Sequence, residues 1–166
     1  MGVLNTTPAT WAVGEKVTAA KMTTEINNAM TNLQAGWTAW TVAWSSTGTA
    51  VAIGNGVFYA AYNQVGKTIT ARFSVTAGTT TTFGTGNYQF TLPVTQAAAY
   101  SINDCMGTAS FKRATGYSGS LIYAGGGKCL VWYGAGATSG VLSQTAPGAW
   151  ASGDLICSGT YSYEAA

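Results

Sequence analysis

The sequence has no histidine, and this absence excludes the most common kinds of enzyme chemistry. Histidine is the usual general base near neutral pH, the base of Ser-His-Asp and Cys-His systems, and a principal zinc ligand. Only five carboxylates are spread over 166 residues, so a multidentate calcium site is not expected either. We therefore expect no catalytic residues, no metal ion and no cofactor.

Charge is also scarce, at 7% of residues where a typical soluble domain has about 25%. The net charge is +2, and the basic residues are scattered apart from the pair Lys112 and Arg113. Nucleic-acid binding needs a clustered basic face that contacts several phosphates, so we expect no nucleic-acid partner. A surface made of Thr, Gly, Ala and Ser is typical of a chain that neighbouring molecules largely cover.

Long apolar runs are missing as well. No stretch approaches the ~20 apolar residues of a membrane span, and the first residues lack the basic and apolar regions of a signal peptide. We therefore expect a soluble chain that is made in the cytoplasm and has no membrane partner. Three cysteines, Cys105, Cys129 and Cys157, leave one unpaired under any intrachain pairing, so we expect reduced, mostly buried thiols.

One enzymatic option survives, a pair of carboxylates that hydrolyses glycans. Its candidates are Asp104, in Asn-Asp-Cys, and Asp154, in Ser-Gly-Asp. Both positions also fit turns before strands, because Asp side chains accept hydrogen bonds from nearby backbone N–H groups. We favour the turn interpretation.

A helix is indicated between residues 18 and 35, the only stretch whose apolar residues recur at helical spacing. Thr18 fits the N-cap position. The apolar residues follow the a/d spacing of a coiled coil over two heptads, at Ala19, Met22, Ile26, Ala29 and Leu33. A helix of about 16 residues is marginal in water, so this stripe needs a partner surface. Two partners fit the pattern: other copies of the chain, or the chain's own β domain.

From residue 36 the pattern changes to the alternation of strands. Trp40, Val42 and Trp44 share one face of a first strand. Further strands are indicated at Val57–Val65, Lys67–Ala77, Tyr88–Leu92, Asp104–Lys112, Ser118–Ala124, Lys128–Tyr133 and Leu155–Tyr163, with a short extra strand near Val141. Alternating faces and frequent turn signals predict a mainly β fold, an antiparallel sandwich of jelly-roll type.

Aromatic side chains are the remaining candidates for binding. Most of them lie in alternating strands, where core packing is expected; they include Trp40, Trp44, Tyr88, Trp132 and Tyr161. Trp150, in a Pro-Gly-Ala-Trp loop, and Tyr117 are better candidates for the surface, where an exposed ring can stack on a glycan.

Short motifs along most of the chain resemble one group of proteins. The first is Thr-Pro-Ala-Thr-Trp at residues 7–11, followed by Gly-Glu-Lys-Val-Thr-Ala at residues 14–19. Later motifs include Trp-Thr-Ala-Trp-Thr at 37–41, Phe-Thr-Leu-Pro at 90–93 and Trp-Ala-Ser-Gly-Asp at 150–154. In this order they resemble small virion surface proteins of tailed bacteriophages that infect actinobacteria, variously called decoration, head-fibre or minor tail proteins.

This resemblance implies a non-enzymatic virion protein, a homotrimer whose N-terminus docks on capsid or tail proteins. Residues 1–17 would then form an extended arm, with Pro8, Trp11, Val13 and Val17 as anchoring residues. Residues 18–35 would trimerise, and residues 36–166 would form the outward β-sandwich on the virion surface. Two alternatives remain: a host-surface glycan-binding module that uses Tyr117 and Trp150, and the carboxylate hydrolase.

Overall fold

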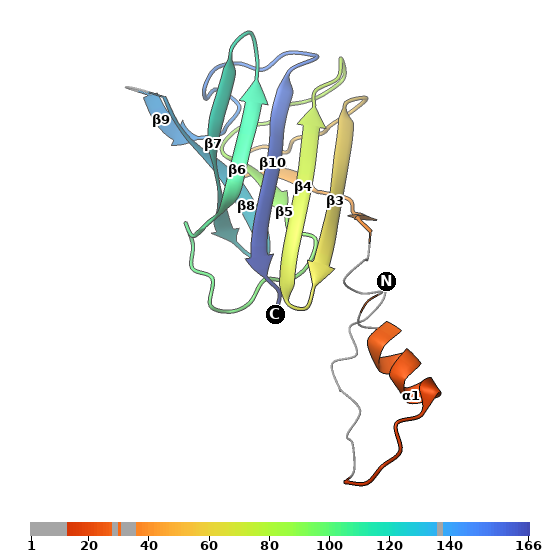
Figure 1. The fold of residues 1–166 in the computed structure, drawn as a ribbon. Coiled ribbons are helices and arrows are strands. Elements are labelled where there is room, and N and C mark those ends of the chain that lie inside the picture. Colours follow the sequence, from red (N-terminus) through yellow and green to blue (C-terminus); the bar gives the residue numbers. More distant parts are fainter. Residues whose placement is uncertain (1–12, 28–29, 31–35, 136–137) are drawn as a thin grey trace.

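The computed structural model describes residues 13–27, 30, 36–135 and 138–166 (Figure 1). Its helical part consists of α1 (Ala19–Met22) and a π-helical segment, η1 (Thr23–Asn27). The strands are β1 (Thr38–Ala39), β2 (Trp44–Ser46), β3 (Val57–Val65), β4 (Thr68–Thr76), β5 (Tyr88–Thr91), β6 (Cys105–Lys112), β7 (Gly116–Gly125), β8 (Lys128–Ala135), β9 (Thr138–Val141) and β10 (Leu155–Glu164). The predicted mainly β, antiparallel fold is confirmed, and the jelly-roll sandwich stays a prediction.

The strands form one antiparallel sheet in the order β1-β3-β4-β10-β6-β7-β8-β5-β2, with β9 beside β8. The two end strands, β1 and β2, belong to one extended segment, so the sheet curls into a half-barrel (Figure 1). The Trp40 N–H donates to the Ala60 carbonyl of β3, at 3.2 Å. Three residues later, Ala43 accepts from the Thr91 N–H of β5, at 3.1 Å. One short segment therefore ties both edges of the sheet.

The predicted continuous first strand is wrong, because the structure divides this segment into the separate strands β1 and β2. The predicted alternation is present, since Val42 and Trp44 are buried while Thr41 and Ala43 are exposed. The strand is nevertheless interrupted between β1 and β2, because the chain leaves one edge of the sheet and joins the other.

The hairpin of β3 and β4 matches its prediction closely. Gly66, which has a φ of +60°, occupies the tight turn, where left-handed backbone favours glycine. On β4, the residues from Ile69 to Val75 at every second position are almost completely buried. Their polar neighbours lie on the outside of the curled sheet, so one face of the hairpin forms the core.

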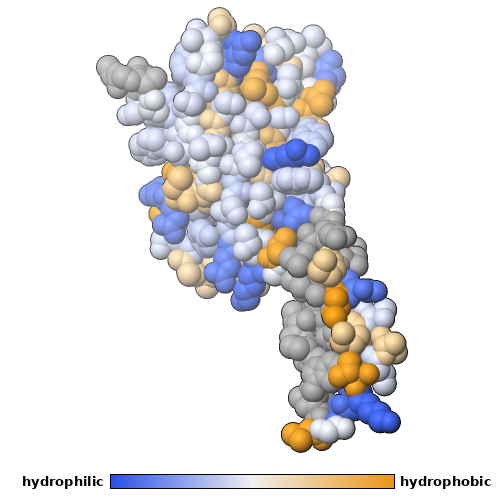
Figure 2. Space-filling model, in the orientation of Figure 1, coloured by the Kyte–Doolittle hydropathy of each residue, from blue (hydrophilic) through white to orange (hydrophobic). Residues whose placement is uncertain are grey.

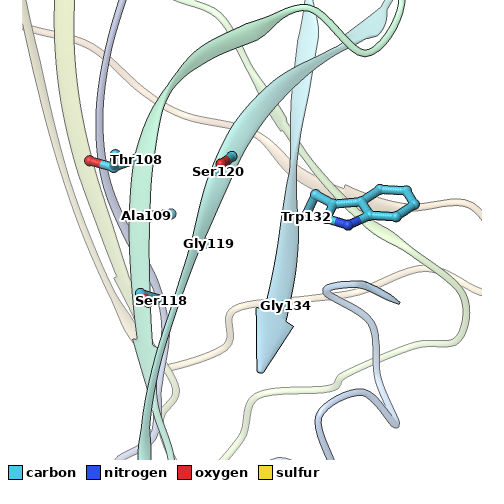
Figure 3. Close-up of a pocket in the computed structure, with 7 residues that line it drawn as sticks. All are labelled: Thr108, Ala109, Ser118, Gly119, Ser120, Trp132 and Gly134. Atoms are coloured by element: carbon cyan, nitrogen blue, oxygen red, sulfur yellow. The ribbon is translucent and has the colours of Figure 1, made fainter. Parts of the chain in front are cut away.

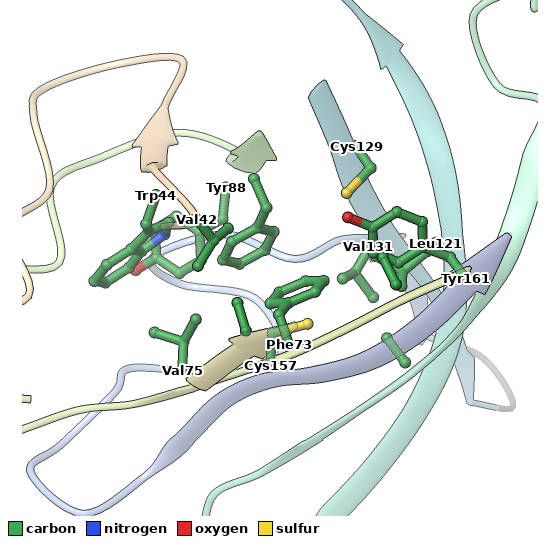
Figure 4. Packing of buried hydrophobic residues seen from close by; sticks show 14 of the residues in the cluster. Val42, Trp44, Phe73, Val75, Tyr88, Leu121, Cys129, Val131, Cys157 and Tyr161 are labelled. Atoms are coloured by element: carbon green, nitrogen blue, oxygen red, sulfur yellow. The ribbon is translucent and has the colours of Figure 1, made fainter. Parts of the chain in front are cut away.

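The core lies inside the curl and joins strands far apart in the sheet (Figure 4). The ring of Phe73 on β4 lies 4.9 Å from the ring of Phe90 on β5, and 6.0 Å from that of Tyr161 on β10. Aromatic pairs at such spacings add stability beyond the area that they bury. Side chains from distant strands of the curled sheet therefore meet in one core.

The burial of two tryptophans is the reverse of the prediction. Trp132, expected in the core, is 48% exposed, because its neighbours Val131 and Tyr133 point inward and the alternation of β8 turns the indole outward. Trp150, expected at the surface, is only 7% exposed. Its loop folds over the core, where the indole N–H donates to the Ser143 carbonyl at 2.8 Å.

Candidate functional site

The helical segment begins as the sequence predicts. Thr18 is the N-cap, and its side chain accepts from the Lys21 N–H at 3.3 Å. Lys21 also forms an ion pair with Glu15, which ties the preceding turn to the first helical residues. The start of the segment is therefore specified locally, by a cap and a charge pair.

After one α-helical turn the structure departs from the predicted heptad helix. Residues Thr23–Asn27 are π-helical, a form in which each turn takes up an extra residue. The segment opens with two threonines, and β-branched hydroxyl residues are poor α-helix formers. Of the five predicted seam residues, Ala19, Met22 and Ile26 are described and exposed, whereas Ala29 and Leu33 lie outside the described residues.

Apolar side chains line this segment. Met22, Ile26 and Met30 are spaced by four residues and are 44%, 49% and 49% exposed; we name these three residues the stem stripe. Figure 1 shows the segment projecting from the end of the β domain, with no strand alongside it, and Figure 2 shows apolar side chains gathered along the projection. The described part of the stem stripe thus does not pack against the chain's own sheet.

Of the residues proposed to anchor the chain, Val13 and Val17 precede the stem stripe, and both are exposed. Pro8 and Trp11 lie outside the described residues. The apolar surface of the segment therefore continues toward the N-terminus from Met22 at least as far as Val17.

A cluster of three residues lies where the chain enters the sheet. The Arg72 guanidinium on β4 stands 4.3 Å from the ring centre of Trp37 and 5.5 Å from that of Tyr59 on β3. It also donates to the Tyr59 hydroxyl, at 3.0 Å. Such cation–π contacts are worth about 0.5–1 kcal/mol at exposed sites, so this cluster helps to hold Trp37 against the sheet. This cluster is not predicted from the sequence, although Arg72 is the only charged residue among the outward hydroxyls of β4.

The outer face of the sheet is covered by serine and threonine. Cross-strand pairing aligns them in two rows, Thr160-Thr108-Ser120 and Ser74-Ser158-Ser110-Ser118. Directly opposed side chains of an antiparallel pair lie on the same face, about 5 Å apart. The first row continues to Trp132, which lies opposite Ser120. The outer face is therefore rich in hydroxyls, and its first row runs from Arg72, which lies opposite Thr160, to the exposed indole of Trp132.

The two carboxylates proposed for hydrolysis do not come together. Asp104 precedes β6 and Asp154 precedes the antiparallel β10, whose first residue pairs with Lys112 at the far end of β6. Eight residues of strand separate them, about 25 Å at ~3.3 Å per residue. Glycoside hydrolysis needs its carboxyl groups within about 10 Å.

Both aspartates occupy turns, as the sequence predicted. The side chain of Asp104 accepts from the Ser101 N–H at 2.8 Å, and that of Asp154 from the Ala151 N–H at 2.7 Å. Each carboxylate thus closes a turn that leads into a strand.

The predicted glycan contacts are both engaged in packing. Tyr117 is half-buried, and its ring stacks on Phe111 at 5.3 Å with an interplanar angle of 7°. Trp150 lies between Phe111 and Tyr88, at ring distances of 6.2 and 6.5 Å. Trp150 therefore presents no open ring face, and one face of Tyr117 is covered.

Two of the three cysteines are buried, as expected, and Cys105 is exposed. Burial raises the pKa of the Cys129 thiol to about 12, and it raises the pKa of Cys157 well above its usual value. Because thiolates rather than thiols attack electrophiles and bind metals, these two buried groups are unreactive near neutral pH.

Within the described ranges, no group of three or more Cys, Asp or Glu side chains is placed to hold a metal ion. No helix in the same part of the chain has the length and apolar character to cross a membrane. Comparison with protein families, with curated proteins and with solved structures finds no match to the chain. Function is therefore inferred from the residues and their geometry.

Proposed function

We propose that the chain is a non-enzymatic structural subunit of a bacteriophage particle, in which three copies associate through the stem stripe. The exposed stem stripe, on a segment that projects from the β domain, is the observation that carries this proposal. A short helical segment with no tertiary partner is marginal in water, so it needs a surface from another molecule. Other copies of the same stripe provide a matching surface, and closed symmetry around a threefold axis suits a capsid or fibre site.

The β domain supports the same proposal. A jelly-roll-like sandwich is consistent with its curled sheet, in which the distant strands β4 and β5 meet through Phe73 and Phe90. The outer face is rich in hydroxyls and poor in charge, which fits a subunit that lies among close neighbours. A compact domain on a short stem favours capsid decoration over a long tail fibre. Residues 1–17 then form the arm that docks on capsid or tail proteins.

The oligomeric state provides the first test. Light scattering after size-exclusion chromatography of the full chain at micromolar concentration should give three times the 17.0 kDa chain mass. A single monomeric species would overturn the proposal.

A second test places the protein on the particle. Antibodies against residues 36–166 should decorate intact phage particles in electron micrographs. Deletion of residues 1–17 should leave the oligomer intact but remove this labelling. Unlabelled wild-type particles would exclude a role as an exposed virion subunit.

A further inference from the structure

A shallow hollow of about 380 Å³ lies on the outer face, over β6, β7 and β8 (Figure 3). It is lined by Thr108, Ala109, Ser118, Gly119, Ser120, Trp132 and Gly134. Its volume is at the lower end of the range of about 300–1,000 Å³ that is typical of small-molecule sites. The hollow is therefore large enough for a small ligand or for one or two units of a polymer.

Side chains of two kinds line the hollow. Thr108, Ser120 and Trp132 lie opposite one another on three neighbouring strands, so the row spans two strand spacings, about 10 Å. Figure 3 shows the indole projecting from β8 on the side away from the strands that carry the hydroxyls, so the indole and the hydroxyls can contact different units of one chain-like ligand. Within the described part of the chain, the hydroxyls of Thr108, Ser118 and Ser120 have no hydrogen-bond partner. They remain available to donate to a ligand and to accept from it.

The chemistry of the lining selects one class of ligand. None of the seven lining residues is charged, so the hollow offers no ionic partner to a phosphate, an acidic sugar or a basic peptide. An indole face attracts the weakly positive C–H groups on the face of a sugar ring. The hydroxyls on the neighbouring strands match the hydroxyls of an adjoining sugar unit. Neutral sugars combine these two features.

We propose that this hollow binds a neutral saccharide chain, with one pyranose ring stacked on Trp132 and the hydroxyls of the neighbouring sugar units bonded to Ser120, Ser118 and Thr108. The proposal depends on the outer face alone, so it does not require self-association or a place on a phage particle. It also moves the expected glycan contact from the loop residue Trp150 to a strand residue.

Isothermal titration calorimetry of the full chain tests this inference, with hexasaccharides of glucose, mannose and galactose as probes and an oligogalacturonate as the charged counterpart. At least one neutral hexasaccharide should bind with millimolar or tighter affinity, and the charged oligomer should bind more weakly. Trp132→Ala should weaken binding by about tenfold or more, the effect of losing one stacked ring. Trp37→Ala is the matched control, because Trp37 is 46% exposed but lies outside the hollow; it should bind like wild type.

A second variant fills the hollow without removing the indole. A Cβ at Gly134 would have only the Ser139 Cβ near it, at 4.0 Å, so Gly134→Leu should fold and should block the sugar. In NMR spectra of the unmodified protein, the indole N–H resonance of Trp132 should shift when the hexasaccharide that binds in calorimetry is added. The inference is overturned if no neutral hexasaccharide binds at about 10 mM. It is equally overturned if Trp132→Ala binds as tightly as Trp37→Ala, or if the Trp132 resonance does not move.

Discussion

Replacement of Ile26 by alanine provides the sharpest test of self-association. Ile26 is about half exposed, so association is able to bury about half of its side chain. The substitution removes three carbon groups, each worth about 0.8 kcal/mol when fully buried, which gives about 1 kcal/mol per copy. A trimer contains three copies, so it loses about 3 kcal/mol, or about a hundredfold in its dissociation constant.

The protein concentration at which half of the trimer dissociates should change by a smaller factor than the dissociation constant does. Trimer dissociation depends on the square of the free concentration, so a hundredfold change moves the midpoint by about tenfold. Sedimentation velocity on a dilution series measures this midpoint directly. Val57→Ala is the control, because Val57 on β3 is 64% exposed and lies outside the stem stripe; its midpoint should equal that of wild type.

Two results would refute the reasoning. An unchanged midpoint for Ile26→Ala would mean that Ile26 is not at the interface. Equal shifts for Ile26→Ala and Val57→Ala would place the interface on the β domain, or would show a general loss of fold. Thermal unfolding of both variants separates these cases, since an exposed stem residue should leave the melting temperature of the β domain unchanged.

Three further predictions concern the β domain. Trp150→Ala should lower the free energy of unfolding by about 3–5 kcal/mol in urea titrations, and a change below about 1 kcal/mol would contradict its buried position. Gly107→Ala should destabilise by about 2 kcal/mol or more, because its Cβ would overlap the Thr160 carbonyl, while Gly134→Ala should be nearly neutral. Burial raises the pKa of Cys129 from 9.0 to about 12, so the folded chain keeps a proton that the unfolded chain loses. Stability should be full below pH 9 and fall as the pH rises toward about 12, with a smaller fall in Cys129→Ala.

Sequence patterns predicted most of the strands because alternation reports directly which face is buried. The β3–β4 hairpin follows from strict alternation on β4 and a glycine at its turn. The pattern did not identify the edge that each strand joins, because alternation carries no information on strand order. For that reason the alternation of Trp40, Val42 and Trp44 predicts one strand, whereas the segment from Thr38 to Ser46 pairs with β3 at one end of the sheet and with β5 at the other.

The candidate sites show the same limit. Trp132 sits in a strand and Trp150 in a loop, so a rule that buries strand aromatics and exposes loop aromatics misplaces both. Trp132 is outward because of its phase relative to Val131, and Trp150 is inward because its loop covers the core. The outward direction of Trp132 follows from the alternation of residues along β8. No comparable pattern in the sequence shows that the loop of Trp150 covers the core.

The scarcity of charge is compatible with the short strands at the two ends of the sheet. Open sheet edges invite pairing between molecules, and many proteins guard them with lysine or other charges. In this chain the end strands β1 and β2 have only two and three residues, and one segment holds them against β3 and β5. Such short end strands offer little backbone of their own for pairing with another molecule, so few guarding charges are needed along them.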